Sequence, residues 1–162
     1  MARGKRILKK DASYHVIAIF NRFENAFELD LFKEMFLVVL MQAKENYSFY
    51  IRNFCIMPNH VHFIIQPTGD SNLPDIMRWI LSVFAKRYNK ANNLKGHLFM
   101  DRYKSKIIED LIQFMNTFNY ISDNPVKANM VKSANLYKFG GFYFILKKIF
   151  DIIEPFELKL SL

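Results

Sequence analysis

Two histidines separated by a single residue form the pair of side chains in this sequence best suited to chemistry. His60 and His62 lie in a run of β-branched and aromatic residues that favours a strand over residues 60–66. Because alternate residues of a strand project from the same face, both imidazoles point to one place, while Val61 and Phe63 point into the core. Two adjacent imidazoles suit the binding of a metal ion. The alternative is a pair of histidines on a solvated strand face.

A second candidate pair lies in the last long helical pattern of the chain. Tyr120 and Asn124 are four residues apart, which places them one turn apart on the same helix face. The phenol is a candidate nucleophile, and the amide oxygen is a candidate third metal ligand. Because Asn124 precedes Pro125, we expect it at the helix end, where the spacing is only approximately helical. Taken alone, the pair is better explained by a buried ring with its hydroxyl hydrogen-bonded.

The sequence excludes several other kinds of site. Cys55 is the only cysteine, so neither an intrachain disulfide nor a zinc site built from several thiolates can form. The HExxH pattern of zinc proteases does not occur. This cysteine usage indicates a reducing, cytoplasmic setting. The most apolar windows, residues 35–43 and 139–150, are shorter than the roughly 18 residues of a membrane span, so we expect a soluble protein without a secretory signal.

The rest of the sequence supplies the elements that must position these side chains. Strands are predicted over residues 14–23, 48–57, 60–66 and 98–108, and helices over residues 30–46, 72–91 and 110–125. The order β-α-β-β-α-β-α matches the ferredoxin-like βαββαβ pattern with an additional C-terminal helix. We therefore predict an α+β fold in which an antiparallel sheet carries helices on one face. Because this fold supports many functions, the activity has to be inferred from the residues of the site.

Local signals predict where the helices begin and end and which faces they bury. Asp30, Asn72 and Asp110 are predicted N-caps, and Pro125 should end or kink the last helix. We expect the inward face of that helix to consist of Leu111, Ile112, Met115, Phe118 and Ile121.

The length and composition fit one folded domain. With 162 residues, of which 51% are hydrophobic and 23% charged, the chain is long enough for one packed core and short for two. We expect a basic lead-in over residues 1–12, the folded domain over residues 13–145 and a C-terminal appendage over residues 146–162.

A net charge of +8 favours a polyanionic partner. Nucleic acid is the first candidate, an anionic membrane surface the second, and solubility alone the plain alternative. Cations that could follow a DNA backbone occur on the second predicted helix, on one face of the fourth strand and at the end of the last helix: Arg78, Lys86, Arg87, Lys90, Arg102, Lys104, Lys106 and Lys127. For any single one of them, a solvated surface position is the simpler interpretation.

Four short motifs, in a fixed order, carry a resemblance to a known family. They are YHV at residues 14–16, CIMPNHVH at 55–62, DRYKS at 101–105 and YISDNPVKA at 120–128. Together they resemble the single-tyrosine HUH transposases and, among these, the REP-associated tyrosine transposases. The resemblance extends from about Tyr14 to Val131, and MPNHVH followed by YIxxNPV is a specific combination.

The resemblance implies a ferredoxin-like nuclease that cuts single-stranded DNA next to a hairpin through a 5′-phosphotyrosine intermediate. By this resemblance His60 and His62 match the metal ligands, Tyr120 matches the nucleophile, and Asn124 matches the polar residue that completes the metal site. The implied cofactor is Mg²⁺ or Mn²⁺, and the implied setting is the nucleoid of a prokaryotic cell. His15 fits the first-strand motif without an assigned role. Relatives act as monomers or as homodimers that exchange the tyrosine helix, and the sequence leaves both open.

Two other functions remain open at this stage. One is a non-catalytic module of the same fold that binds hairpin DNA or RNA, and the other is a replication-initiator-like HUH nuclease. Tyr88 and Tyr103 also lie among cations, and we interpret both as residues that contact DNA or pack rather than as the nucleophile.

Overall fold

The order of strands and helices along the chain follows the predicted order. A computed structural model of the chain describes residues 5–21 and 25–156. The strands are β1 (Ser13–Ile19), β2 (Phe49–Met57), β3 (His60–Pro67) and β4 (Lys104–Ile108), and the helices are α1 (Asp30–Asn46), α2 (Leu73–Ala91), α3 (Leu111–Lys127) and α4 (Gly141–Leu146), with a short 3₁₀ turn η2 (Ala134–Leu136).

The four strands form one antiparallel sheet in the order β2-β3-β1-β4. The two strands that are central in the sheet are therefore β1 and β3, which are separated in sequence by α1 and β2. This is the ferredoxin-like strand order, so the predicted α+β fold is confirmed. A central position gives the side chains of β1 and β3 neighbours on both sides.

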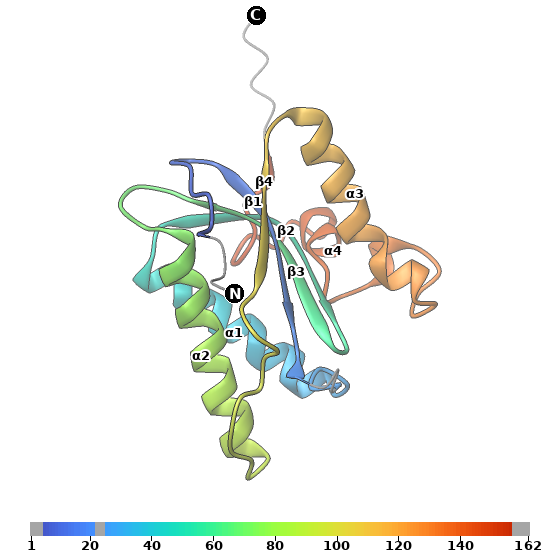
Figure 1. The fold of residues 1–162 in the computed structure, drawn as a ribbon. Helices are drawn as coiled ribbons and strands as arrows, with labels where there is room; N and C mark the ends of the chain where they lie inside the picture. Colours follow the sequence, from blue (N-terminus) through green and yellow to red (C-terminus); the bar gives the residue numbers. More distant parts are fainter. Residues whose placement is uncertain (1–4, 22–24, 157–162) are drawn as a thin grey trace, which may run out of the picture.

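The sheet has two faces that are covered by different helices. On one face α1 and α2 pack against β3, with Phe36 and Phe84 5.1 Å apart and Phe36 6.0 Å from Phe63 between ring centroids. On the other face lies the additional helix α3, together with α4 (Figure 1). Residues that alternate along β1 and β3 therefore enter two different environments, a dry aromatic core and a layer under α3.

Two of the predicted strands are longer than the observed ones. The prediction of a strand over residues 98–108 is wrong for its first half, because Phe99 makes only an isolated bridge to Phe20 and Asp101 adopts a left-handed backbone with φ 54°. Arg102 consequently lies before β4 and not on its face. The first strand ends at Ile19, and the last two residues of its predicted range, 22 and 23, lie outside the described residues.

The helix caps agree with the prediction at two of three positions. The side chains of Asn72 and Asp110 accept hydrogen bonds from the backbone N–H groups three residues later, as predicted. Asp30 is not a cap: α1 begins at Asp30 itself, and its carboxylate binds Lys33 and Lys138 at 3.0 Å each. None of the helices within the described residues has the length and apolar character that crossing a membrane requires.

Helix α3 differs most from its prediction. It continues past Pro125 to Lys127, and its predicted inward residues Leu111, Ile112 and Met115 are exposed. Helix α3 buries Phe114, Ile121 and Pro125, and Phe118 packs half-buried against the core, so the prediction is right for Phe118 and Ile121. The Phe114 ring lies 5.0 Å from the ring of Phe156. The stripe that contains Phe114 and Phe118 is buried because two aromatic rings remove more apolar surface from water than the predicted aliphatic residues do.

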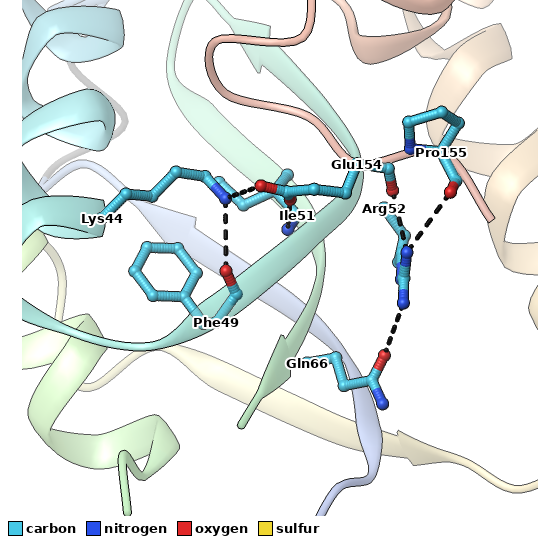
Figure 2. Close-up of polar contacts among 7 residues, drawn as sticks. All are labelled: Lys44, Phe49, Ile51, Arg52, Gln66, Glu154 and Pro155. Atoms are coloured by element: carbon cyan, nitrogen blue, oxygen red, sulfur yellow. Dashed lines mark hydrogen bonds and ion pairs between the residues drawn. The ribbon is translucent and has the colours of Figure 1, made fainter. Parts of the chain in front are cut away.

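The free edge of β2 is covered by Glu154 and Pro155 (Figure 2). Glu154 donates its N–H to the Ile51 carbonyl oxygen, and its carboxylate accepts the Ile51 N–H, each at 2.9 Å. The same carboxylate pairs with Lys44. Arg52 donates to the carbonyls of Glu154 and Pro155 and to Gln66 at 3.1–3.3 Å. We call Lys44, Arg52, Gln66 and Glu154 the β2 clamp.

Candidate metal and nucleophile site

The histidine pair lies at the start of the central strand β3, directly after the two-residue turn Pro58-Asn59 that joins it to β2. His62 is 2% exposed and His60 is half-buried, while Val61 and Phe63 on the opposite face are fully buried. The alternation that places both imidazoles on one face is thus present. That face is not a solvated one at His62, because α3 lies over it.

Tyr120 extends from α3 over His62 and His15 of the same chain. Its ring centroid is 5.6 Å from that of His62 and 5.9 Å from that of His15, with both rings nearly perpendicular to it. The residue is 46% exposed. A half-exposed phenol beside two imidazoles can reach a ligand from solvent, which a ring sealed in the core cannot do.

Hydrogen bonds hold one atom of each candidate ligand. The rings of His62 and His15 are joined by a contact of 3.1 Å between His62 Nδ1 and His15 Nε2, and His60 Nδ1 contacts Asn59 Oδ1 at 2.6 Å. Asn124 donates its amide N–H to the Tyr120 carbonyl oxygen at 2.8 Å, so both residues are helical and one turn apart. The atoms left to face a ligand are Nε2 of each paired histidine and Oδ1 of Asn124.

Burial keeps the imidazoles in their neutral form. Desolvation, with smaller contributions from His60 and His15, lowers the pKa of His62 to about 3. Burial also lowers the pKa of His60, and burial followed by the charge of Lys106 lowers the pKa of His15. At neutral pH these rings carry a free lone pair, which is the form that binds a metal ion.

The donor atoms fit a divalent ion that accepts few protein ligands. Within residues 5–21 and 25–156, no group of three or more His, Cys, Asp or Glu side chains is arranged to hold a metal ion. The predicted donor set is two imidazole nitrogens from β3 and one amide oxygen from α3. Two imidazoles suit several transition metals, whereas a phosphate beside them would favour Mg²⁺ or Mn²⁺, which use few protein ligands and complete their coordination with water and phosphate oxygens.

Three of the predicted DNA-contacting cations surround the site. Lys104 and Lys106 stand opposite Ile17 and His15 in the β1–β4 pairing, and paired residues of antiparallel strands share a face. The Lys127 amino group lies 5.3 Å from the centroid of the Tyr120 ring. These cations give the rim of the site a positive charge.

The other predicted cations lie away from the histidines. Arg78, Lys86, Arg87 and Lys90 are on α2, which covers the opposite face of the sheet. Arg78 is paired with Asp75 at 2.7 Å, and Arg87 donates to Gln42 at 2.7 Å. Arg102 and Arg78 line a hollow of about 630 Å³ beside β4. The structure therefore divides the predicted cations into a group at the site and a group on α2 and directly before β4.

The two other tyrosines that lie among cations have packing roles. Tyr103 is 9% exposed and lies under the Arg6 guanidinium at 3.8 Å. Tyr88 packs against Phe32 and Phe84, with ring centroids 4.7 and 5.9 Å apart. Neither ring lies with the histidines as the Tyr120 ring does.

Two residues in this layer were not predicted to have a role. His15 was detectable in principle, since a histidine on β1 shares a face with the pair once the strand register is known. Asn53 on β2 is fully buried and hydrogen-bonded to α3. The only signal for Asn53 in the sequence is a polar residue within an otherwise apolar strand.

The fold and the side chains define a class of protein. A ferredoxin-like sheet presents two histidines on a central strand to a single tyrosine on the helix that follows the last strand, as in the single-tyrosine HUH proteins. The family described as "Transposase IS200 like" matches residues 9–124. The chain belongs to this IS200-like transposase family.

Individual relatives agree with this assignment. A Haemophilus influenzae protein provisionally named a REP-associated tyrosine transposase is 22% identical over 153 residues, covering 88% of this chain and 86% of that protein. The REP-associated tyrosine transposase of Escherichia coli is 27% identical over 105 residues, covering 64% and 61%.

Solved structures share the fold. A REP-associated tyrosine transposase bound to a REP hairpin superposes with a TM-score of 0.75 at 22% identity, covering 97% of this chain and 93% of that chain. A provisionally assigned transposase of Deinococcus radiodurans gives a TM-score of 0.51 at 16% identity, covering 76% and 95%.

Proposed function

We propose that this protein nicks and rejoins single-stranded DNA next to hairpins through a covalent bond between Tyr120 and a 5′ phosphate. The observation that carries the proposal is the position of the Tyr120 ring, half-exposed and 5.6 Å from the His62 ring of the same chain. Membership of a transposase family and the relative bound to a REP hairpin support this choice of substrate.

In this proposal His60 and His62 hold Mg²⁺ or Mn²⁺ through their Nε2 atoms, and Asn124 adds its amide oxygen. When bound, the ion offsets the charge of the scissile phosphate and fixes its orientation. His15 keeps the His62 ring in place through the 3.1 Å contact with Nδ1. A ligand histidine that is held through its second nitrogen presents the first one in a fixed direction.

Tyr120 performs the covalent step. Its oxygen forms a bond to phosphorus while the bond from phosphorus to the 3′ oxygen breaks. The phenol loses its proton and the departing 3′ oxygen gains one, so the charges balance. Because the new ester conserves the energy of the old one, attack by another 3′ hydroxyl rejoins the strand without a nucleotide cofactor. Lys127, 5.3 Å from the ring, offsets negative charge that develops on the phenol.

The strand that enters the site needs contacts to its backbone. Lys104 and Lys106 flank His15 on the β1–β4 face, and they are suited to bind the phosphates next to the scissile one. Arg78 and Arg102 at the hollow beside β4, with Lys86, Arg87 and Lys90 on α2, would bind DNA further from the cut. Because one chain carries the histidines and the tyrosine together, a monomer contains the whole proposed site, and a homodimer is not required for it.

A covalent adduct on a denaturing gel tests this function. The purified protein is incubated with a short hairpin oligonucleotide carrying single-stranded flanks, with Mn²⁺ or with EDTA. We expect an adduct that resists denaturation, requires Mn²⁺ and falls by about 10,000-fold or more in Tyr120→Phe, because the nucleophile is lost. Tyr50→Phe is the matched control, since Tyr50 is a similarly exposed tyrosine in the β2 clamp region, and it should leave the adduct unchanged.

Other results would contradict the proposal in distinguishable ways. An adduct of full yield in Tyr120→Phe would show that another residue is the nucleophile. Salt-sensitive binding of the hairpin without any adduct, under all metal conditions, would favour a non-catalytic binding module.

A further inference from the structure

Apart from tyrosines and Cys55, the described residues include three buried side chains that are polar or charged, and one of them has no role so far. They are Lys33, His62 and Asn53. Lys33 pairs with Asp30, and His62 belongs to the proposed site. Asn53 lies on β2 with no exposed surface, at the point where the pairing of β2 with β3 shifts register after Ile51. A buried amide is costly unless its hydrogen bonds are made, so its partners indicate what it does.

The partners of Asn53 are on the helix that carries Tyr120. Its amide nitrogen donates to the carbonyl oxygen of Phe118 and to the hydroxyl of Ser122, each at 3.0 Å. Its own oxygen accepts the N–H of Phe54 at 2.9 Å. Both amide hydrogens and the oxygen are therefore used. The two contacts on α3 lie two residues before and two residues after Tyr120.

The geometry of a helix places these contacts on the flank opposite Tyr120. Successive residues are about 100° apart around the axis, so Tyr120 is turned by about 160–200° from both Phe118 and Ser122. Asn53 thus holds one flank of α3 above β2, and the other flank extends Tyr120 over β3 and β1. Rotation of α3 about its own axis would move the phenol relative to the histidines, and the Asn53 contacts oppose this rotation.

The Asn53 side chain is closely packed against α4. Gly141, at the start of α4, faces the amide directly. A Cβ added at Gly141 would overlap Asn53 Oδ1 and come within 2.8 Å of the Phe54 nitrogen. A glycine at this position is what allows the amide to turn toward α3.

We propose that Asn53 is a positioning residue that sets the rotation of α3 and thereby keeps the Tyr120 hydroxyl aligned with the phosphate held at His60 and His62. This rests on the proposed function of Tyr120. A rotation of about 10° moves an atom roughly 6 Å from a helix axis by about 1 Å. Misplacement of reacting groups by about 1 Å can slow a reaction by about 100-fold. Small losses of alignment would therefore reduce the rate without changing DNA affinity.

The first experiment separates rate from binding. We expect Asn53→Ala to lower the rate of adduct formation at saturating hairpin DNA by about 10- to 100-fold, with the Kd for the hairpin changed by less than about twofold. Ser122→Ala keeps the bond to Phe118 and should have a smaller effect. Val39→Ala is the control, because it removes buried volume from α1 on the other face of the sheet and should lower the melting temperature without lowering the rate.

The second experiment does not depend on activity. The protein is labelled with 3-fluorotyrosine, and the ¹⁹F resonance of Tyr120 is identified by its loss in Tyr120→Phe. In Asn53→Ala this resonance should shift and broaden, whereas in Val39→Ala it should stay as in the wild type. A structural role limited to folding would instead give equal rates per folded molecule and an unchanged Tyr120 resonance, which would overturn the proposal. If the wild type forms no adduct, the proposed function fails, while the fluorine spectra still test the effect of Asn53 on Tyr120.

Discussion

The β2 clamp and the histidine–tyrosine site are two groups of polar side chains on this sheet that differ in the partners of their side chains. In the β2 clamp every charge has an opposite charge or a carbonyl: Lys44 pairs with Glu154, and Arg52 donates to two backbone carbonyls and to Gln66. At the histidine–tyrosine site the groups that contact His62 are the neutral rings of His15, His60 and Tyr120. The charged ends of the clamp are paired within the chain, with Arg52 Nε as the one buried clamp atom that has no hydrogen-bond partner, whereas the site retains lone pairs for a ligand.

The pKa shifts express the same difference. Burial lowers the pKa of Lys44, but its bond to the oppositely charged Glu154 acts in the opposite direction and offsets part of that lowering. At His62 burial and the neighbouring histidines all act in one direction and lower the pKa to about 3. We infer that the clamp contributes to stability and that the site exchanges some stability for the ability to bind. Substitutions in the two regions should therefore affect different measurements.

Among the variants that compare the two regions, the largest expected effect is on the rate of adduct formation, from a change at the site. His62→Ala removes a proposed metal ligand, so we expect Mn²⁺ binding to weaken and adduct formation to slow by about 1,000-fold or more. The rate is measured on denaturing gels and Mn²⁺ binding by calorimetry. Glu154→Gln is the matched change in the clamp, and it should leave the rate per folded molecule within about twofold of the wild type. Equal losses in both variants would remove the functional distinction between the regions.

The next effect is on stability, from a change in the clamp. Glu154→Ala breaks the ion pair with Lys44 and leaves the Ile51 N–H without its acceptor. Because both groups are partly buried, we expect the free energy of unfolding to fall by about 1–3 kcal/mol in urea titrations.

An exposed glutamate on α1 provides the control for the clamp. Glu45→Ala should change the free energy of unfolding by less than about 0.5 kcal/mol. If Glu154→Ala were no more destabilising than Glu45→Ala, the C-terminal segment would not stabilise the β2 edge.

The site could be predicted from sequence to the extent that it rests on short spacings. His60 and His62 share a face because strands repeat every two residues, and Tyr120 and Asn124 share one because helices repeat about every four. The contacts that complete the two regions join residues that are far apart in the sequence. The separations are 47 residues for His15 and His62, 69 for Asn53 and Ser122, and 110 for Lys44 and Glu154. These long-range contacts depend on strand register and helix rotation, which cannot be inferred from the spacing of residues in a single sequence. The wrong inward prediction for three residues of α3, Leu111, Ile112 and Met115, has the same cause, because they also satisfy the helical spacing.

A smaller effect, on Mn²⁺ affinity, is expected from a change at His15, at the edge of the site. His15 contacts His62 through the nitrogen that does not face the proposed ion, so His15→Phe should weaken Mn²⁺ binding by about tenfold while retaining the fold. Calorimetric titration with Mn²⁺ measures this. His97→Phe, a change in the exposed loop before Leu98, is the control and should leave Mn²⁺ affinity unchanged. A His15 variant with wild-type affinity would show that the 3.1 Å contact does not orient His62.

The smallest expected effect on Mn²⁺ affinity and adduct rate comes from a change at Cys55. This residue lies on β2 directly opposite His62 in the strand pairing, and thus between the two regions. Its position would suit a metal ligand, but burial raises the pKa of its thiol to about 12. A thiol binds metal ions and reacts with alkylating agents as the thiolate, which is scarce in the folded protein near neutral pH. We therefore expect Cys55→Ala to change Mn²⁺ affinity and adduct rate by less than about twofold. Iodoacetamide should alkylate Cys55 slowly in the folded protein and rapidly in urea. Fast alkylation of the folded protein, or loss of metal binding in Cys55→Ala, would place the thiol in the site and extend the site onto β2.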